Sequence, residues 1–251
     1  MPAPAQIGKP DMASGPDPRD ICAPVPDWVP PPLPARAPIA GRFCDLEPLR
    51  ADHAPGLFAA FAEDATGEMW RYTTIDGFDS AAACGAWVER ARLAHDPLMF
   101  AIRLADGRLG GVISLQRMQP AAGSIETGWL AFAPRMQRTT AATEAVFLLM
   151  QWAFEAGYRR FEWKCNAANL RSRRAAVRFG FSYEGIFRQA DVVRGRNRNT
   201  AWFAAIDAEW PALRAAYAQW FDAANFDADG RQRASLRSLT APILAVHDLL
   251  A

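Results

Sequence analysis

The chain has 251 residues, of which 51% are hydrophobic and 22% charged, enough for one sizeable core without a second full domain. Its formal net charge of +1 comes from 28 basic and 27 acidic side chains, so no overall field draws it to nucleic acid or to an anionic membrane. No apolar run approaches the roughly 20 residues that span a bilayer, and proline and charge occupy the N-terminus where a signal peptide is apolar. We therefore expect a cytoplasmic protein.

The cysteines and histidines predict neither a disulfide framework nor a metal site. The four cysteines are widely spaced and form no Cys-x-x-Cys pair, and the three histidines do not complete a ligand cluster. These residues are Cys22, Cys44, Cys84, Cys165, His53, His95 and His247.

Composition also suggests the domain boundaries. Residues 1–40 hold much of the proline, including the run Pro30–Pro32, and carry neither a helical nor a strand period, which predicts an N-terminal arm. Trp28 fits two interpretations: it docks on the body or on a second subunit, or the arm is a loosely packed extension. We expect one domain over 41–210 and a C-terminal helix and extension over 211–251.

The first half of this domain predicts strands and two helices. Short apolar runs are typical of strands, and an Asp-Gly pair at 106–107 is typical of a hairpin turn. Asp52 precedes an amphipathic stretch and is predicted to cap it. The expected elements are a strand at 43–49, helices at 52–63 and 80–94, strands at 98–104 and 111–115, and a strand at 124–133.

The second half alternates helices with strands. From Thr139 to Ala156 the apolar side chains form one helical stripe, which Gly157 ends. Gly195–Asn199 is predicted as the polar turn of a second hairpin. The expected elements are a helix at 139–156, a strand at 160–165, a helix at 170–179, strands at 183–193 and 200–206, and a helix from after Asp207 to 221. This order predicts an α/β or α+β fold with one mixed sheet flanked by helices.

The turn before the helix at 139–156 has the character of an anion site. A helix N-terminus leaves backbone N–H groups unpaired and carries partial positive charge, and small residues there allow a pyrophosphate to approach. Arg138 adds charge, and the hydroxyls of Thr139 and Thr140 are further donors. Threonine at this place is also an ordinary helix cap, and the turn alone does not decide between the two.

A longer motif includes this turn. It reads Gln137-x-x-Thr140-x-Ala142, followed by Thr143-Glu144-Ala145. The pattern resembles the pyrophosphate motif of the GNAT acetyltransferases in its RimJ/RimL-like form, with Thr140 where the family has its central glycine.

A second motif follows at the spacing that the same family shows. Asn169-x-x-Ser172, with Gly180-Phe181 at the end of the next helix, is similar to the family pattern, and Ile125–Leu130 resembles its preceding strand. The resemblance covers roughly residues 41–210 and leaves both tails outside.

The resemblance implies a fold and a donor. The fold is a GNAT-like mixed, splayed sheet with N- and C-terminal extensions, and the donor is acetyl-CoA, used without a metal. Pantetheine pairs with the free backbone near Leu130 to Phe132, and the pyrophosphate meets the start of the following helix. The cofactor-binding residues so implied are Leu130, Phe132, Gln137, Arg138, Thr139, Thr140, Ala141, Ala142, Thr143, Asn169 and Ser172.

Acyl transfer to an amine needs a base, because an alkylamine with a pKa of about 10.4 is mostly protonated at neutral pH. Glu126 is the first candidate, acting directly or through water; the alternative is a structural carboxylate. Glu162 is the second candidate, and otherwise pairs with a nearby arginine. The acid/base pair of some GNAT enzymes falls on Lys164 and Ala176 here and is therefore absent.

Ser172 and Asn169 are expected beside the departing sulfur. Ser172 would hydrogen-bond the thiolate, and Asn169 would cap its helix while touching the cofactor; the pair also fits plain capping. Three arginines that follow are candidates for the 3′-phosphate of CoA or for a solvated face: Arg171, Arg173 and Arg174.

These residues predict an N-acetyltransferase that moves an acetyl group from acetyl-CoA to a primary amine by direct attack in a ternary complex. The alternative is a GNAT-fold sensor or scaffold that binds acyl-CoA and catalyses little. The acceptor is either a protein α-amine, as the RimJ/RimL resemblance implies, or a small-molecule amine. No nucleic acid or membrane partner is expected, since the aromatic residues fit a core. The two tails are candidates for shaping the acceptor cleft or a homodimer contact.

Overall fold

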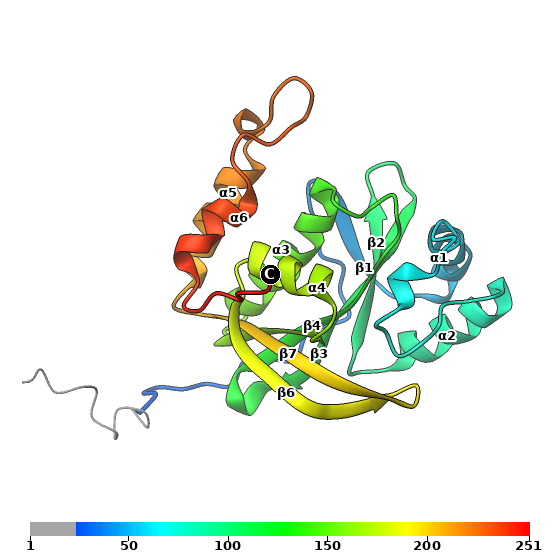
Figure 1. The fold of residues 1–251 in the computed structure, drawn as a ribbon, viewed down its shortest axis with the longest axis horizontal. Coiled ribbons are helices and arrows are strands. Elements are labelled where there is room, and N and C mark those ends of the chain that lie inside the picture. Colours follow the sequence, from blue (N-terminus) through cyan, green and yellow to red (C-terminus); the bar gives the residue numbers. More distant parts are fainter. Residues whose placement is uncertain (1–23) are drawn as a thin grey trace, which may run out of the picture.

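A computed structural model describes residues 24–251, so Cys22 and the first part of the predicted arm lie outside the described residues. The described chain forms one seven-stranded mixed sheet with flanking helices (Figure 1), which confirms the predicted fold class. Its strands and α-helices are β1 (Cys44–Pro48), α1 (Ala54–Phe61), α2 (Ala81–Leu93), β2 (Leu98–Leu104), β3 (Leu109–Gln119), β4 (Ser124–Phe132), α3 (Thr140–Glu155), β5 (Arg160–Asn166), α4 (Leu170–Arg178), β6 (Ser182–Val193), β7 (Arg196–Ile206), α5 (Trp210–Phe221) and α6 (Leu236–Thr240).

The sheet has the strand order β1-β2-β3-β4-β5-β7-β6. Neighbouring strands run antiparallel except β4 and β5, which run parallel. A parallel pair needs a crossover connection, and α3 supplies it. The carboxyl ends of β4 and β5 therefore lie at one edge of the sheet, where α3 and α4 begin.

Strand β2 separates two hydrophobic cores. Leu98, Phe100 and Ile102 point into the core that contains α3, α4 and α5, whereas Met99 and Ala101 point into the core that contains α1 and α2. Alternate side chains of a strand face opposite sides of a sheet, and here both sides are covered. This explains why β2 is apolar at every position from Leu98 to Ile102. In Figure 1, α1 and α2 lie together at one side, away from α3 and α4.

The predicted helix cap at Asp52 is wrong. Helix α1 begins at Ala54, after a short 3-10 turn over Ala51–His53. The carboxylate of Asp52 instead pairs with Arg50, whose Nε lies 3.1 Å from Oδ1. Because the Asp52 carboxylate binds the Arg50 guanidinium, it does not accept a hydrogen bond from the N-terminus of α1.

The predicted turn at Gly195–Asn199 is also wrong. Strands β6 and β7 pair as far as Val193 and Arg196, so the turn contains only Arg194 and Gly195. Both have left-handed backbones, with φ of 49° and 70°, as a tight hairpin turn with right-handed twist requires. The polar residues after the turn belong to β7, and they are polar because this part of the hairpin meets solvent.

The described part of the N-terminal arm docks on the body through Trp28. Its indole N–H donates to the carbonyl of Ala121 at 3.3 Å, and the guanidinium of Arg159 lies 5.6 Å from the ring centroid. The ring covers Gly123, where an added Cβ would come within 2.5 Å of it. Of the two interpretations of Trp28, docking on the body is the one that the structure shows.

The C-terminal extension belongs to the same core. Helix α5 buries Leu213, Tyr217 and Trp220 against α3 and its neighbours. Beyond α6, Asp248 reaches back to α4 and accepts hydrogen bonds from Arg173 at 2.6 and 2.7 Å, with both side chains at most 3% exposed. Among the described helices, none has the length and apolar character that crossing a bilayer requires.

Candidate functional site

Strands β4 and β5 separate partway along their length. They pair over Ser124–Thr127 and Arg160–Trp163, and the register ends there. On its other side, β4 carries a bulge against β3, with Trp129 at a left-handed φ of 49°. Residues 128–132 therefore turn one backbone edge toward a wedge instead of toward β5.

A cavity of about 1900 Å³ occupies this wedge. Its walls come from β4 beyond the split, from the start of α3, and from the end of β5 with α4. Of the residues predicted to bind the cofactor in the two motifs, Ala141 lies outside the lining, because its side chain packs on the core. The predicted residues that line the cavity are Glu126, Leu130, Phe132, Gln137, Arg138, Thr139, Thr140, Ala142, Thr143, Asn169 and Ser172.

The turn between β4 and α3 is held by its own side chains. Thr139 is the N-cap, and its hydroxyl accepts the N–H of Ala142 at 3.2 Å. Gln137 donates from its side-chain amide to the carbonyl of Phe132 at 2.8 Å, which ties the strand end to the turn. Arg138 has a left-handed φ of 65°, which turns the chain into the helix. Capping and an open anion site thus coexist in one turn.

Thr140, which replaces the motif glycine, is the first residue of α3. It is not among the described residues with positive φ, so no conformation reserved for glycine is needed here. The N–H groups of the first helical turn lack acceptors within the helix, and those of Thr140 and Ala141 remain available to an anion. The threonine takes up space at this site but does not strain the backbone.

Glu126 is buried in the cavity wall, with 2% of its surface exposed. Its Oε1 accepts a hydrogen bond from Gln116 at 2.7 Å, while Oε2 lies 3.0 Å from Lys164 Nζ and 3.2 Å from Arg117 Nε. Burial raises the pKa of Glu126 above its ordinary value, and the attraction of Lys164 opposes that rise. The carboxylate is therefore fixed in position and holds a proton more readily than a free glutamate.

Replacing Lys164 with methionine is expected to raise the pKa of Glu126 further, because one of the two cations that favour the carboxylate is gone and Arg117 alone remains. The acidic limb of the kcat/KM profile should move to higher pH. Rates at pH 5 to 9 for wild type, Lys164→Met and Lys164→Arg provide the measurement, with the arginine variant as the charged control. A limb that stays in place in the methionine variant would show that Glu126 does not set it.

Ser172 lies on the opposite wall, in the first turn of α4. Its backbone N–H is capped by the side chain of Asn169 at 3.1 Å, so the predicted capping is present. The indole N–H of Trp163 donates to the Ser172 hydroxyl oxygen at 3.1 Å. Because that oxygen already accepts a bond, its own O–H is left to act as a donor, and the Cys165 thiol is one neighbour within its reach.

Replacing Ser172 with alanine is expected to lower kcat roughly tenfold to hundredfold, because the departing thiolate loses a charged-group hydrogen bond. Binding of acetyl-CoA should change little, and Asn169 can still cap the alanine N–H. Stopped-flow turnover and calorimetric binding separate the two, with Ser172→Thr as the control that keeps the hydroxyl. An unchanged kcat would show that the Ser172 hydroxyl has no part in catalysis and that the residue serves only in the helix cap with Asn169.

The geometry agrees with a known family. The acetyltransferase (GNAT) domain family model matches residues 45–182, more than half of the chain. This chain belongs to the GNAT acetyltransferase family. The RimJ/RimL-like resemblance of its motifs is confirmed, and the protein is an acetyltransferase.

Solved structures place this GNAT acetyltransferase among bacterial relatives. A GCN5-related N-acetyltransferase from Brucella melitensis is 44% identical with a TM-score of 0.84, and the match covers 86% of this chain and 100% of that one. A probable acetyltransferase (GNAT family) from Chromobacterium violaceum ATCC 12472 is 37% identical with a TM-score of 0.70, covering 75% and 95%.

A more distant neighbour shares the fold alone. The Microcin C7 self immunity acetyltransferase MccE, solved in complex with acetyl-CoA and AMP, is 19% identical with a TM-score of 0.59, covering 66% of this chain and 93% of that one. A search of curated proteins gives no match.

The arginines at the start of α4 in this GNAT acetyltransferase have different roles. Arg171 and Arg174 line the cavity and are exposed, which fits both the phosphate-binding and the solvated alternative. Arg173 does not: it is 2% exposed, and its guanidinium is bound by Asp248. A phosphate role for Arg173 is therefore wrong, because a carboxylate from the far C-terminal segment already occupies it.

Glu162, the second candidate base, lies outside the cavity lining. Its Oε1 accepts a hydrogen bond from Arg160 Nε at 2.6 Å. Arg160 also binds both carboxylate oxygens of Glu184, at 2.6 and 2.5 Å. Glu162 is thus the ion-paired partner of an arginine, which was the alternative expected for it.

The end of the cavity near the β6–β7 hairpin is built from residues that sequence reasoning missed. Side chains from the loop before α2, including Glu68 and Tyr72, face the hairpin residues Phe187 and Asp191. Arg194 at the hairpin tip pairs with the carboxylate of an aspartate in that loop and donates to a loop carbonyl at 2.9 Å, 123 residues away. A short sequence pattern cannot predict a contact between residues so far apart along the chain.

Glu144 of the first motif has a structural role. Its carboxylate accepts the backbone N–H groups of Arg42, Phe43 and Cys44, at 2.9, 2.5 and 2.9 Å. These bonds fix the start of β1 to the second turn of α3. The motif therefore contains one residue that supports the site without facing it.

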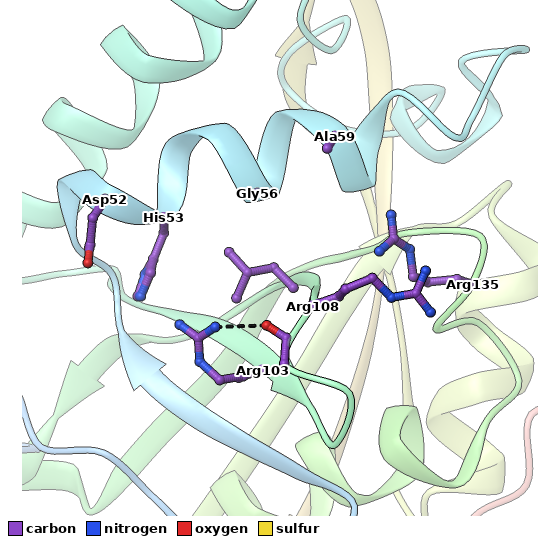
Figure 2. A pocket seen from close by; sticks show the side chains of 9 residues that line it. Asp52, His53, Gly56, Ala59, Arg103, Arg108 and Arg135 are labelled. Carbon is purple, nitrogen blue, oxygen red and sulfur yellow. Dashed lines mark hydrogen bonds between the residues drawn. The ribbon is translucent and has the colours of Figure 1, made fainter.

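A smaller hollow of about 360 Å³ lies between α1 and the β2–β3 turn (Figure 2). No predicted site residue lines it, and Arg103 there also donates to the carbonyl of Gly107 at 3.0 Å. Each arginine of the hollow is paired with a carboxylate: Arg103 with Glu47, Arg108 with Asp106, and Arg135 with Glu63. Across residues 24–251, no group of three or more His, Cys, Asp and Glu side chains gathers as a metal site.

Proposed function

We propose that this GNAT protein is an N-acetyltransferase that moves an acetyl group from acetyl-CoA to a primary amine. The observation that supports this most directly is the position of Glu126, whose buried carboxylate lines the same cavity as Ser172. The neighbour solved with acetyl-CoA supports acetyl-CoA as the donor.

The proposed position of the donor follows from the splay. Pantetheine pairs with the free backbone edge of residues 128–132, and the pyrophosphate meets the N–H groups of Thr140 and Ala141. The thioester then lies between Glu126 on β4 and Ser172 on α4. In this arrangement the free strand edge binds the amide groups of pantetheine, the helix N-terminus binds the phosphates, and the two side chains flank the reacting thioester.

In the proposed step the amine nitrogen attacks the thioester carbonyl carbon within a ternary complex. A new C–N bond forms, the C–S bond breaks, and the amine proton passes to Glu126 directly or through one water. The Ser172 hydroxyl stabilises the sulfur as it gains negative charge. The products are an N-acetyl amide and CoA, and no acyl-enzyme forms.

The acceptor enters from the end of the cavity near the hairpin. This end combines acidic, aromatic and hydroxyl side chains, including Glu68, Tyr72 and Asp191, which fit an amine with a polar attachment. A protein α-amine and a small-molecule amine are both acceptors of this class. Comparing the acetylation rates of N-terminal peptides and of small-molecule amines in one assay decides which class is the acceptor.

Calorimetric titration of acetyl-CoA, paired with thiol release from a panel of amines and N-terminal peptides, tests the proposal. We expect binding together with release that depends on the amine. Binding without release from any amine would favour the sensor or scaffold function instead. Failure to bind acetyl-CoA would contradict both.

A further inference from the structure

Arg178 is a cation in the cavity that the proposed chemistry does not use. It is the last residue of α4, and its guanidinium donates from both terminal nitrogens to the hydroxyl of Thr143, at 3.1 Å each. Thr143 lies one turn into α3, so Arg178 sits beside the end of the helix that is proposed to receive the pyrophosphate. Both residues line the cavity.

No carboxylate of residues 24–251 pairs with Arg178; Thr143 accepts its hydrogen bonds. The arginines of the smaller hollow each have an acidic partner, and so does buried Arg173. Burial lowers the pKa of Arg178 below its ordinary value, because no anion offsets the loss of solvent. Three of its five N–H donors remain without an acceptor in the described structure. A half-buried cation with unused donors favours an anionic ligand.

The C-terminal extension holds Arg178 in place. The guanidinium lies 5.2 Å from the ring centroids of both Phe179 and Trp220. Trp220 belongs to α5, outside the matched family domain, and its indole N–H donates to Gln232 at 2.8 Å. Two aromatic rings beside one guanidinium restrict its rotation while leaving open the N–H donors that Thr143 does not use.

The same extension forms a wall of the cavity. Trp220, Phe226, Gly230 and Gln232 all line it, together with Arg178. Figure 1 shows the segment after α5 on the opposite side of the molecule from the tip of the β6–β7 hairpin. This wall therefore lies at the end of the cavity away from the acceptor.

We propose that Arg178 binds a phosphate of the CoA nucleotide, and that Trp220 in the C-terminal extension positions it for this role. The inference rests on the proposed function, since it takes CoA as the ligand. The guanidinium presents a planar pair of donors, which matches two oxygens of one phosphate. The 3′-phosphate and the pyrophosphate share this chemistry.

Calorimetric titration of CoA and of 3′-dephospho-CoA into wild type, Arg178→Met and Arg178→Lys tests the inference. The methionine variant should raise the Kd of CoA roughly tenfold to hundredfold, and lysine should restore part of the loss. A loss confined to CoA assigns the 3′-phosphate, whereas an equal loss for both ligands assigns the pyrophosphate. Arg214→Met, an exposed change on α5, is the control for net charge.

The positioning role has its own test. Trp220→Leu should weaken CoA binding when Arg178 is present and have little further effect in the Arg178→Met background. Equal effects in both backgrounds would overturn the positioning role. If the methionine variant does not fold, Arg178→Gln gives the same comparison.

Unchanged CoA affinity in a folded Arg178→Met protein, checked by its thermal unfolding, would overturn the phosphate assignment. Failure of the wild type to bind CoA is a different result and would overturn the proposed function instead.

Discussion

Replacing Glu126 with glutamine is expected to lower kcat/KM about 10²- to 10⁴-fold, the range that a positioned base contributes. The amide keeps nearly the same shape and can still accept the hydrogen bond from Gln116. It cannot take the proton of the attacking amine. Steady-state rates against amine concentration, together with a titration of acetyl-CoA, show whether the loss lies in chemistry or in donor binding.

The matched control for this variant is Glu162→Gln. Glu162 is the register partner of Glu126 on β5, and its removal leaves Arg160 bound to Glu184 through two hydrogen bonds. We expect this variant to retain nearly full activity. If both variants retain activity, the base is another group; if both lose it, the loss reflects disturbance of the paired strands.

Replacing Asp248 with asparagine is expected to lower the free energy of unfolding by about 3–5 kcal/mol, the usual effect of removing one partner of a buried ion pair. Arg173 would keep its charge at 2% exposure without its counter-ion. Burial raises the pKa of Asp248, but the hydrogen bonds from Arg173 and from the N–H of Leu250 outweigh it, and the pKa lies below its ordinary value. Urea unfolding at pH 7 measures the difference.

The pH dependence of this effect has a definite sign. A carboxylate with a lowered pKa contributes stability above its unfolded value, about 3.9, and loses that contribution as the pH falls through its folded value. The gap between wild type and Asp248→Asn should therefore be full at pH 7 and narrow below about pH 4. The double variant Arg173→Met, Asp248→Leu should recover much of the stability, since no lone charge remains. A single variant as stable as wild type would show that the pair is not buried in solution.

The predictable part of the site is local in sequence. The turn from Gln137 to Thr143 and the pair Asn169 and Ser172 are short patterns whose backbone geometry repeats wherever a strand leads into a helix. Glu126, the proposed base, was named because its strand resembles the family strand, and the sequence left open which way its side chain faces. Apart from Ala141, these residues line one cavity in the structure.

The missed features depend on contacts across long stretches of chain. Arg173 looked like a phosphate ligand because the sequence does not show that Asp248 returns to it. Arg178 stands just before the Gly180-Phe181 pair of the second motif, but the motif gave it no role, and its place beside Trp220 of α5 appears only in the structure. The tight turn at Arg194 was misplaced because polar residues in a solvent-exposed hairpin resemble a loop.

The pairing of Arg173 with Asp248 also orders events during synthesis. The two residues are 75 positions apart, so a ribosome adding about 5–20 residues per second makes the carboxylate roughly 4 to 15 seconds after the guanidinium. During that interval α4 has no counter-ion for Arg173. The cavity wall formed by Trp220, Phe226, Gly230 and Gln232 is likewise made after all seven strands of the sheet. The nascent chain therefore has the sheet and α4 before it has this wall and the carboxylate that neutralises Arg173.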